Sequence, residues 1–539
     1  MTLNRGVLII ILIAFGASAE AGESFTTVSN LLKKDWLTQV GDGNNSVDDF
    51  RQMAVDASGN TYITAYASAP GDPPVFGAFI AKIDPDGVLV WKTTHSTDGN
   101  LDSPKGVGAD AAGNVYMLCD ASNVSSLVKF DAAGNKLLVT KVGSEANSRD
   151  PVDFHVMADG RTFQLVRRNT LDLQDSGFDL VCISTDGATV FSIKLPDSNR
   201  TQFARMDCDA DGNSYVSYDK LDAPDLLAKF DAGGALLWSM EFTDAPGIYF
   251  GAGFVIASTY DATTRNGRLL KLDPASGATV AEYNHFETSG FGQLSFDASG
   301  NVYGSHILSG NVSFVKLDAS LNLLWLYRYR GPDSNEEPSG IFADNAGNVY
   351  CGITTYFGIT ARNYVTVLLN SGGEPLAVDR EKLAGLATAA MGRDSAGTIR
   401  LAGDYGLPTK SKDPVGSTFA VFKYSGVTAP ANGVLQYRAP KKISFGKFRT
   451  SDFGQVKKVK KLKLKNKSKT DPVIVTFKSS GPPFHADGSH LLLPGERYSL
   501  ELRYVPIAHG DFTGTLLIGS SDPAFQNATV PLSASAMPR

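Results

Sequence analysis

Residue types that carry out chemistry are scattered through the sequence instead of being grouped in a motif. The seven histidines never adopt the His-x-His or His-Glu-x-x-His spacing that presents two imidazoles to one zinc ion. The sequence has no Gly-x-Ser-x-Gly elbow for a serine nucleophile, no P-loop for phosphate and no dinucleotide-binding fingerprint. It therefore predicts no catalytic, cofactor-binding or metal-binding residue, and no cofactor.

Two acidic turns come nearest to a metal site. Asp84-Pro-Asp-Gly87 and Asp209-Ala-Asp-Gly-Asn213 place carboxylates beside a glycine, an arrangement that suits a hard cation such as calcium. Neither segment continues to the distant glutamate of an EF-hand, and related copies elsewhere replace the second aspartate with serine or alanine. A hydrogen-bonded turn is therefore the preferred interpretation.

A lysine-rich run from Lys457 to Lys469 is the strongest charge feature. Such a run could attract anionic polysaccharide, lipid head groups or nucleic acid. Leu462 and Leu464 alternate with lysines, however, as in a half-buried strand whose lysines cover the solvated face and the edge. No aromatic residue interleaves the lysines to stack on bases, so nucleic acid is not expected as a partner.

Four cysteines are few for an exported protein, and their spacing fits neither a CxxC motif nor a Cys/His metal site. They are Cys119, Cys182, Cys208 and Cys351. Isolated buried thiols are the preferred interpretation, and Cys182 with Cys208 is the first pair to check for a disulfide.

The elements that position these residues are indicated by a phrase of the form Asp-x-x-Gly-Asn-x-Tyr. Clear copies begin at Asp56, Asp110, Asp209, Asp297 and Asp344, and weaker copies begin at Met157 and Asp394. In six of the seven copies an aromatic residue follows six positions after the first residue. The aspartate side chain caps a tight turn and glycine adopts positive φ, so each copy predicts a β-hairpin.

A second phrase, Lys-x-Asp-x-x-Gly followed by an apolar strand, interleaves with the first. Its clearest copies lead to Trp91, Trp238 and Trp325, each seven residues after the aspartate. The fourth tryptophan, Trp36, lies in a similar short strand ahead of the first repeat. All four tryptophans are therefore predicted to occupy one structural position.

Each repeat unit is predicted to form four short strands, and units spaced 47 to 54 residues apart are typical of β-propeller blades. The second phrase gives eight units and the first gives seven, with the absent copy near Gly247 to Tyr260. Eight blades are preferred, and seven blades with one aberrant unit is the alternative. The Trp36 strand would supply the outer strand of the last blade and close the ring.

The two phrases resemble the bacterial β-propeller repeats known as SBBP repeats, and more loosely the NHL-type propellers. The resemblance covers about residues 30 to 428 and implies the fold. It does not imply one function, because propellers include lyases, dehydrogenases, sugar binders and scaffolds.

The composition changes from Leu435 onward, where 17 basic residues face 7 acidic ones. Alternating apolar strands every 10 to 15 positions predict a seven-strand sandwich. Matching segments include Ile443-Ser-Phe-Gly446, Leu493-Pro-Gly-Glu496, Leu502-Arg-Tyr-Val-Pro506 and Ser521-Asp-Pro523. This series resembles the immunoglobulin-like domains of the ASPM/SPD-2/Hydin family, whose bacterial members are described as choice-of-anchor D modules. The resemblance implies an extracytoplasmic β-sandwich and not a catalyst.

The first residues predict a secretory signal. Arg5 precedes an apolar run from Val7 to Phe15, and small residues with an Ala-x-Ala pattern allow cleavage after Ala19 or Ala21. The predicted order is thus a signal peptide (1–21), a β-propeller (24–428), a linker (429–435) and an immunoglobulin-like β-sandwich (436–539). No later segment is long and apolar enough to span a membrane, so the mature chain is expected to be secreted, periplasmic or associated with the cell surface.

These features favour a non-enzymatic binding, adhesion or scaffold protein, expected to be a monomer, with a protein or glycan ligand at the cell envelope. The alternative is a propeller lyase or hydrolase that acts on an extracellular polymer at the axial channel. Convergence of His155, His285 and His306 on the axis beside arginine and aspartate would favour the enzyme.

Overall fold

The chain is all-β in its described part. The computed structural model describes residues 30–40, 49–69, 75–96, 102–143, 148–169, 176–196, 198, 203–220, 223–244, 246–261, 266–286, 291–308, 311–329, 335–357, 361–384, 389–406, 417–450, 453, 457–480, 483–486 and 488–538. The predicted signal segment 1–21 lies outside these ranges. Among the described residues, no helix is long and apolar enough to cross a membrane.

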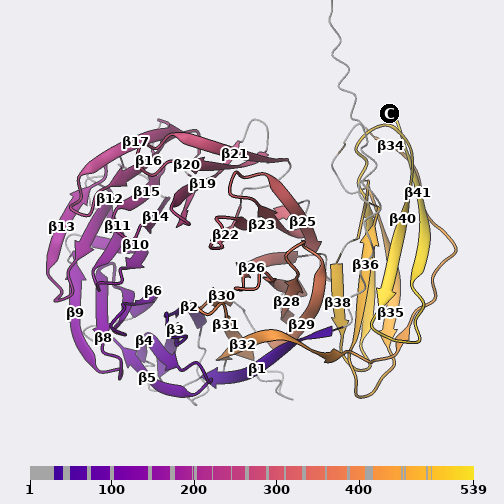
Figure 1. The fold of residues 1–539 in the computed structure, drawn as a ribbon, viewed down its shortest axis with the longest axis horizontal. Helices are drawn as coiled ribbons and strands as arrows, with labels where there is room; N and C mark the ends of the chain where they lie inside the picture. Colours follow the sequence, from indigo (N-terminus) through magenta and orange to yellow (C-terminus); the bar gives the residue numbers. More distant parts are fainter. Residues whose placement is uncertain are drawn as a thin grey trace, which may run out of the picture.

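Six successive units are separate four-stranded antiparallel sheets, which form blades 1 to 6 of the ring in Figure 1. Blades 1 and 2 contain β2 (Asp49–Val55), β3 (Thr61–Ala69), β4 (Val75–Ile83) and β5 (Leu89–His95), then β6 (Asp102–Ala109), β7 (Val115–Ala121), β8 (Ser125–Phe130) and β9 (Lys136–Val142). Blades 3 and 4 contain β10 (Ser148–Val156), β11 (Thr162–Asn169), β12 (Gly177–Ile183) and β13 (Thr189–Lys194), then β14 (Ala204–Cys208), β15 (Ser214–Tyr218), β16 (Asp225–Phe230) and β17 (Leu236–Phe242). Blades 5 and 6 contain β18 (Gly247–Gly251), β19 (Phe254–Asp261), β20 (Asn266–Leu272) and β21 (Thr279–Phe286), then β22 (Gln293–Phe296), β23 (Val302–Leu308), β24 (Asn311–Leu317) and β25 (Leu323–Tyr329).

The last two blades share one eight-stranded sheet, which also closes the ring. Blade 7 contains β26 (Asn335–Ala343), β27 (Val349–Phe357), β28 (Ala361–Leu369) and β29 (Pro375–Ala384), and blade 8 contains β30 (Ala389–Arg393), β31 (Ile399–Gly406), β32 (Ser417–Pro430) and β1 (Asn30–Val40). Strand β1 pairs antiparallel with β32, so that Trp36 lies opposite Lys423. The described strands therefore form eight blades, and the predicted closure by the Trp36 strand is confirmed.

The turns of the first phrase owe their shape to one carboxylate each. In blade 2, the Oδ1 atom of Asp110 accepts the backbone N–H groups of Ala112 and Asn114, and Oδ2 accepts the Asn114 amide and the Tyr116 hydroxyl. Gly113 takes φ +81° at the tightest point. Both phrases join consecutive antiparallel strands, first to second and third to fourth, so their turns lie on the same face of the ring.

Blade 5 departs from this pattern at the place where the sequence lacks a clear copy. Strands β18 and β19 are joined through Ala252 and Gly253, both of which have positive φ, without a capping aspartate. The blade nevertheless has four paired strands, and β18 and β19 pair without a break from Gly247 opposite Ser258 to Gly251 opposite Phe254. The aberrant unit is thus a full blade, as the eight-blade prediction requires.

The C-terminal part is a sandwich of two sheets around one apolar core. The first sheet contains β33 (Leu435–Gln436), β35 (Lys458–Asn466), β39 (Arg497–Tyr504) and β37 (Phe484–His485), and the second contains β34 (Ile443–Arg449), β41 (Ala528–Met537), β40 (Gly510–Ser520), β36 (Val473–Ser479) and β38 (Gly488–Leu492). Phe477, Leu500 and Leu516 are almost completely buried between them. The predicted β-sandwich is confirmed as a fold, although its described part has nine strands in place of the seven expected.

The sandwich packs against the propeller near β25 and β29 (Figure 1). Ile474 and Leu491 of the sandwich share an apolar cluster with Tyr329 and Val378 of the propeller. At the same contact Arg380 of β29 forms a 2.9 Å ion pair with Glu496, and its side chain is only 8% exposed. The two folds therefore share a buried interface.

Candidate functional site at the propeller axis

The first strand of every blade lines the axis, and these inner strands contact their neighbours around the ring. Two positions on each inner strand, two and four residues before the first turn, recur around this opening. The position nearer the turn holds Ala54, Gly108, His155, Asp207, Tyr249, Ser295, Phe342 and Gly392, and the farther one holds Gln52, Gly106, Asp153, Arg205, Gly247, Gln293, Gly340 and Ala390. Ionisable side chains at these positions occur only on β10, β14 and β18.

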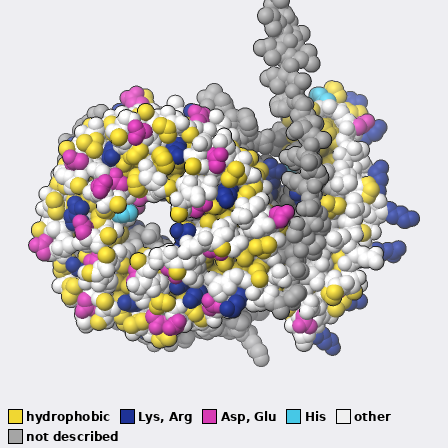
Figure 2. Space-filling view, viewed as in Figure 1, with side chains coloured by type: hydrophobic (Ala, Val, Ile, Leu, Met, Phe, Trp, Pro, Cys, Tyr) yellow, Lys and Arg dark blue, Asp and Glu magenta, His cyan; other side chains and the backbone are white. Residues whose placement is uncertain are grey.

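We call this group the axial cluster: Asp153, His155, Arg205, Asp207 and Tyr249. Glycine and alanine occupy both of these positions in blades 2 and 8. The ionisable groups therefore lie on one side of the axis. Figure 2 shows the central opening, with a histidine and basic side chains on its rim.

Asp207 ties blade 4 to blade 5. Its Oδ2 atom accepts the backbone N–H of Phe250 on β18 at 2.7 Å, and Oδ1 accepts that of Cys208 at 2.8 Å. Burial raises the pKa of this carboxyl to about 6, although the two hydrogen bonds favour the charged form. Asp207 is thus ionised at neutral pH and titrates in mildly acidic solution.

Asp153 makes the same kind of link one blade earlier. Its Oδ2 atom accepts the backbone N–H of Met206 at 2.9 Å, and Oδ1 accepts that of Phe154 at 2.9 Å. Burial raises the pKa of Asp153, while nearby Arg205 acts in the opposite direction. Two successive blade junctions are therefore fastened at the axis by a carboxylate.

The imidazole of His155 lies beside the second of these carboxylates, with 3.5 Å between its Nδ1 atom and Oδ1 of Asp207. Burial lowers the pKa of His155, so the ring is neutral at pH 7. The side chains of His155 and Asp207 remain 36% and 25% exposed, so both retain contact with solvent.

Arg205 and Tyr249 complete the cluster. The Arg205 guanidinium lies 4.8 Å from the ring centre of Phe203, and its side chain is exposed. The Tyr249 hydroxyl donates to the Gly292 carbonyl at 2.8 Å, and burial raises its pKa to about 12. Tyr249 thus presents a neutral, anchored ring beside an exposed cation.

At neutral pH the axial cluster carries two carboxylates, one guanidinium and a neutral imidazole. It therefore offers hydrogen-bond acceptors and donors side by side with a slight excess of negative charge. In the described part of the chain, no group of three or more His, Cys, Asp or Glu side chains is arranged to hold a metal ion. The arrangement suits a neutral ligand with several hydroxyl or amide groups.

The three histidines singled out from the sequence do not come together. His155 lies on the inner strand β10, His306 is buried on the second strand β23 against the Phe291 ring, and His285 lies on the outermost strand β21, where its side chain is outside the described residues. Only His155 belongs to the axial cluster. The predicted sign of an enzyme, convergence of all three, is not met.

The turn interpretation of the calcium-like segments is confirmed at Asp209. Its Oδ1 atom accepts the N–H groups of Asp211 and Asn213, and Oδ2 accepts the Asn213 amide and the Tyr215 hydroxyl. The carboxylate is thus committed to the turn and to the following strand.

The lysine-rich run forms strand β35, as the alternation of Leu462 and Leu464 predicted. Leu464 is 2% exposed, while Lys461 points to solvent and pairs with Glu501 at 2.9 Å. The four cysteines are buried free thiols, so no disulfide joins Cys182 to Cys208. The preferred interpretations of both features are confirmed.

Sequence reasoning missed four members of the axial cluster: Asp153, Arg205, Asp207 and Tyr249. A signal for them was present, because each lies two or four residues before a repeat turn or at the equivalent position in blade 5. Reading those two positions down all eight units would have separated the ionisable inner strands from the glycine-rich ones.

Comparisons with known proteins identify no family. No protein-family model matches the sequence, and no curated protein matches it. Among solved structures, the Dos1 propeller is similar with a TM-score of 0.48 and 12% identity, over 72% of this chain and 95% of that chain. A structure from a study of two prolyl endopeptidases has a TM-score of 0.43 and 10% identity over 67% and 55% of the chains. The Neurospora crassa Pan2 WD40 domain has a TM-score of 0.36 and 10% identity over 60% and 89%.

Proposed function

We propose that this chain is an exported, non-enzymatic binding protein that takes a polar ligand, a glycan or a protein segment of the cell envelope, at the axial opening of its propeller. The observation that carries the proposal is the one-sided gathering of the axial cluster on three successive inner strands. Groups with perturbed pKa values that remain accessible in an opening are typical of functional sites.

The charge of the cluster narrows the ligand class. Two carboxylates against one guanidinium disfavour an anionic polymer, whereas hydroxyl groups can donate to Asp153 or Asp207 and accept from Arg205. The Tyr249 ring adds an apolar surface for the C–H face of a sugar. A neutral glycan is therefore the ligand that fits best.

Export and family membership belong to the same proposal. The segment 1–21 has the composition of a secretory signal. The eight-bladed ring and the appended sandwich are compatible with an SBBP- or NHL-like propeller joined to an ASPM/SPD-2/Hydin-like domain. Mass spectrometry of protein recovered outside the cytoplasm should find a new N-terminus at Glu20 or Gly22; an intact Met1 end would contradict export.

The experiment is a binding screen of the chain from Gly22 against neutral glycans and envelope extracts. Arg205→Ala and Asp207→Asn should each weaken binding at least tenfold, because each removes a hydrogen-bonding group from the cluster. Lys463→Ala, on the exposed face of the sandwich, is the matched control and should leave binding unchanged. Equal binding by wild type and Arg205→Ala, or loss in the Lys463→Ala control, would contradict the proposal.

A second candidate, a hydrolase or lyase at the same opening, is favoured by one observation. A carboxyl with a raised pKa lies 3.5 Å from a neutral imidazole, and such a pair can supply an acid and a base. If the protein is this enzyme, His155→Gln should retain ligand binding and lose product formation. A bound glycan that stays intact during long incubation would remove this candidate.

A further inference from the structure

At four junctions between blades, a tryptophan on the outer strand of one blade packs on a turn of the next blade, and we call this side chain a plug. Trp36, Trp91, Trp238 and Trp325 each lie opposite the lysine of the second phrase in their own blade. Each indole Nε1 donates a hydrogen bond of 3.0 to 3.1 Å to a backbone carbonyl in the next blade. The acceptor is the second residue of that blade's turn between its third and fourth strands: Pro85, Ala132, Pro274 and Ser371. The predicted common position of the four tryptophans is confirmed.

The plug requires glycine in the neighbouring turn. A Cβ atom added to Gly87 would lie 2.5 Å from the Trp36 ring, and one added to Gly373 would lie 2.7 Å from the Trp325 ring. The indole therefore rests directly on the backbone of the next blade.

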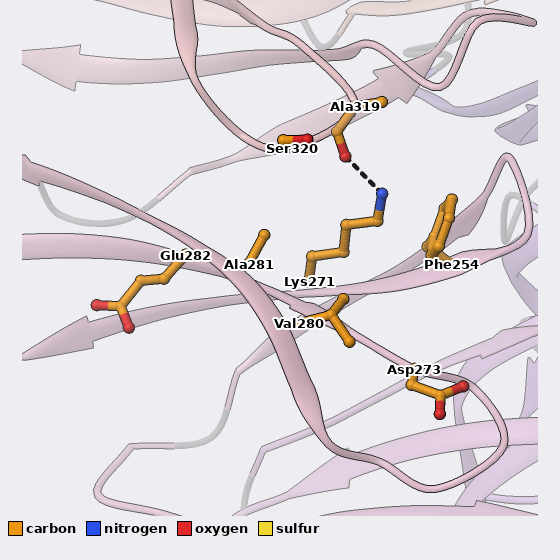
Figure 3. Close-up of a pocket in the computed structure, with 8 residues that line it drawn as sticks. All are labelled: Phe254, Lys271, Asp273, Val280, Ala281, Glu282, Ala319 and Ser320. Atoms are coloured by element: carbon orange, nitrogen blue, oxygen red, sulfur yellow. Dashed lines mark hydrogen bonds between the residues drawn. The ribbon is translucent and has the colours of Figure 1, made fainter.

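The junction between blades 5 and 6 lacks both the tryptophan and the turn glycine that receives it. The residue opposite Lys271 is Ala281, and the turn of blade 6 has Leu321 in the glycine position with φ +62°. Leu321 is 2% exposed, and its side chain belongs to an apolar cluster with Ile256 and Leu269 of blade 5. A cavity of ≈ 570 Å³ remains, lined by Phe254, Lys271, Asp273, Val280, Ala281, Glu282, Ala319 and Ser320 (Figure 3).

The walls of this cavity combine apolar side chains with three charged ones, Lys271, Asp273 and Glu282, and with the Ala319 carbonyl. Figure 3 shows the Lys271 side chain crossing the cavity, with Phe254 on one side and Ala281 on the other. The Lys271 ammonium lies 3.3 Å from the Phe254 ring centre and donates to the Ala319 carbonyl at 2.5 Å. Burial lowers the pKa of Lys271.

The Ala319 carbonyl corresponds to the carbonyls that receive tryptophan elsewhere. At Pro85, Ala132 and Pro274 the equivalent oxygen accepts both a lysine ammonium and an indole N–H. Within the described residues, the Ala319 oxygen accepts the lysine alone. A carbonyl oxygen has two lone pairs, so a second donor can bind here.

We propose that the blade 5–blade 6 cavity is a docking site for the indole of a tryptophan on a partner polypeptide. The apolar side chains of Phe254, Val280 and Ala281, a remaining acceptor and a volume within the range of ligand pockets match a flat ring with one N–H group. All four tryptophans of this chain are held in their own junctions, so the indole comes from another molecule. The site is on the outer rim and is separate from the axial cluster.

The incoming ring does not copy the internal plug, because Leu321 occupies the surface on which that indole would lie. It instead packs between Phe254, Val280 and the methylene stem of Lys271, above Leu321. The N–H reaches Ala319 from the solvent side. A lone tryptophan in an extended segment of the partner satisfies this geometry.

The test uses saturation-transfer NMR on the chain from Gly22, with N-acetyltryptophanamide as the probe and titration to determine stoichiometry. Wild type should bind one equivalent. Ala281→Trp/Leu321→Gly rebuilds the internal plug and should bind none. The reciprocal variant, Trp325→Ala/Gly373→Leu, opens an equivalent cavity at the next junction and should bind two.

Thermal melts establish that each variant is folded. If the double variant Ala281→Trp/Leu321→Gly unfolds, the single variant Ala281→Leu replaces it, because leucine fills the cavity without rebuilding the plug. It too should lose the probe. Absence of binding to wild type, or binding that persists in both cavity-filling variants, would overturn the proposal. If Ala281→Leu loses the probe and Arg205→Ala still binds it, the result supports this site independently of whether the axial cluster binds a ligand.

Discussion

Asp110 and Asp207 show two uses of an aspartate in this protein, one in a local turn and one in a contact between blades. Asp110 takes its hydrogen bonds from residues within six positions of itself, so its role could be predicted from one phrase. Asp207 binds the N–H of Phe250, which is 43 positions away on another blade. No local pattern contains that partner, and the axial cluster was therefore invisible to motif reasoning although its residues recur at a fixed place in each unit.

The pH dependence of stability should report on Asp207. Its folded pKa of about 6 lies above the ordinary 3.8, so between these values the folded state holds a proton that the unfolded state has lost. The contribution of Asp207 is thus greatest below about pH 4, falls as pH rises to about 6 and is constant above that, a change of about 1–3 kcal/mol. Asp207→Asn removes this pH-dependent contribution, so the variant should gain stability relative to wild type as the pH rises from about 4 to about 6.

Urea midpoints of both proteins at pH 4, 5, 6 and 7 measure the difference. Stability curves that stay parallel from pH 4 to 6 would show that the Asp207 carboxyl titrates as it does in the unfolded chain.

At the scale of elements, most of the propeller fold could be predicted from the spacing of the repeats. Hairpins separated by 47 to 54 residues defined four-stranded blades, and the tryptophan strand ahead of the first unit correctly indicated how the ring closes. Blade 5 shows the limit of this reasoning. Its Gly253 turn replaces the usual phrase, and only the pairing of β18 and β19 shows that the blade is complete.

Strand β35 tests the protective role of lysine on an edge. Its only neighbour along most of its length in the described sheet is β39, since β33 reaches only Lys465 and Asn466. Replacing Lys461, Lys463 and Lys465 with valine should leave a flat apolar edge and cause concentration-dependent association. Light scattering at increasing concentration measures this.

Replacing the same three lysines with glutamate is the matched control. This variant should stay monomeric, because a charge of either sign opposes edge pairing. A valine variant that remains monomeric at high concentration would refute the edge role of β35.

At the scale of the whole molecule, the interface between propeller and sandwich could not be read from the sequence. Arg380 and Glu496 are 116 positions apart and belong to different folds. Glu496 also accepts the Leu493 N–H, and Arg380 donates to the Leu491 carbonyl, so one ion pair organises the end of β38 and the turn that follows. Neither residue lies in a motif that predicts the other.

Arg380→Met should weaken the docking of the sandwich on the propeller, so that the two folds unfold in separate transitions. It leaves the Leu491 carbonyl and Glu496 without their partner and should cost about 2–4 kcal/mol of docking. Calorimetry should then show the sandwich melting apart from the propeller. Lys461→Met breaks the exposed pair with Glu501 and, as the control, should change stability by less than about 1 kcal/mol. Identical melting profiles for Arg380→Met and wild type would rule out this role for the pair.

The closure of the ring by β1 also determines when the propeller can complete its folding during synthesis. Asp35 and Ser425, whose side chains hydrogen-bond across the closure, are 390 positions apart. At about 5–20 residues per second, a ribosome needs about 20–80 s to make the residues between them. Throughout that interval the first strand of the propeller is already synthesised and its partner does not yet exist. The closure of the ring is therefore one of the last steps in the formation of the propeller.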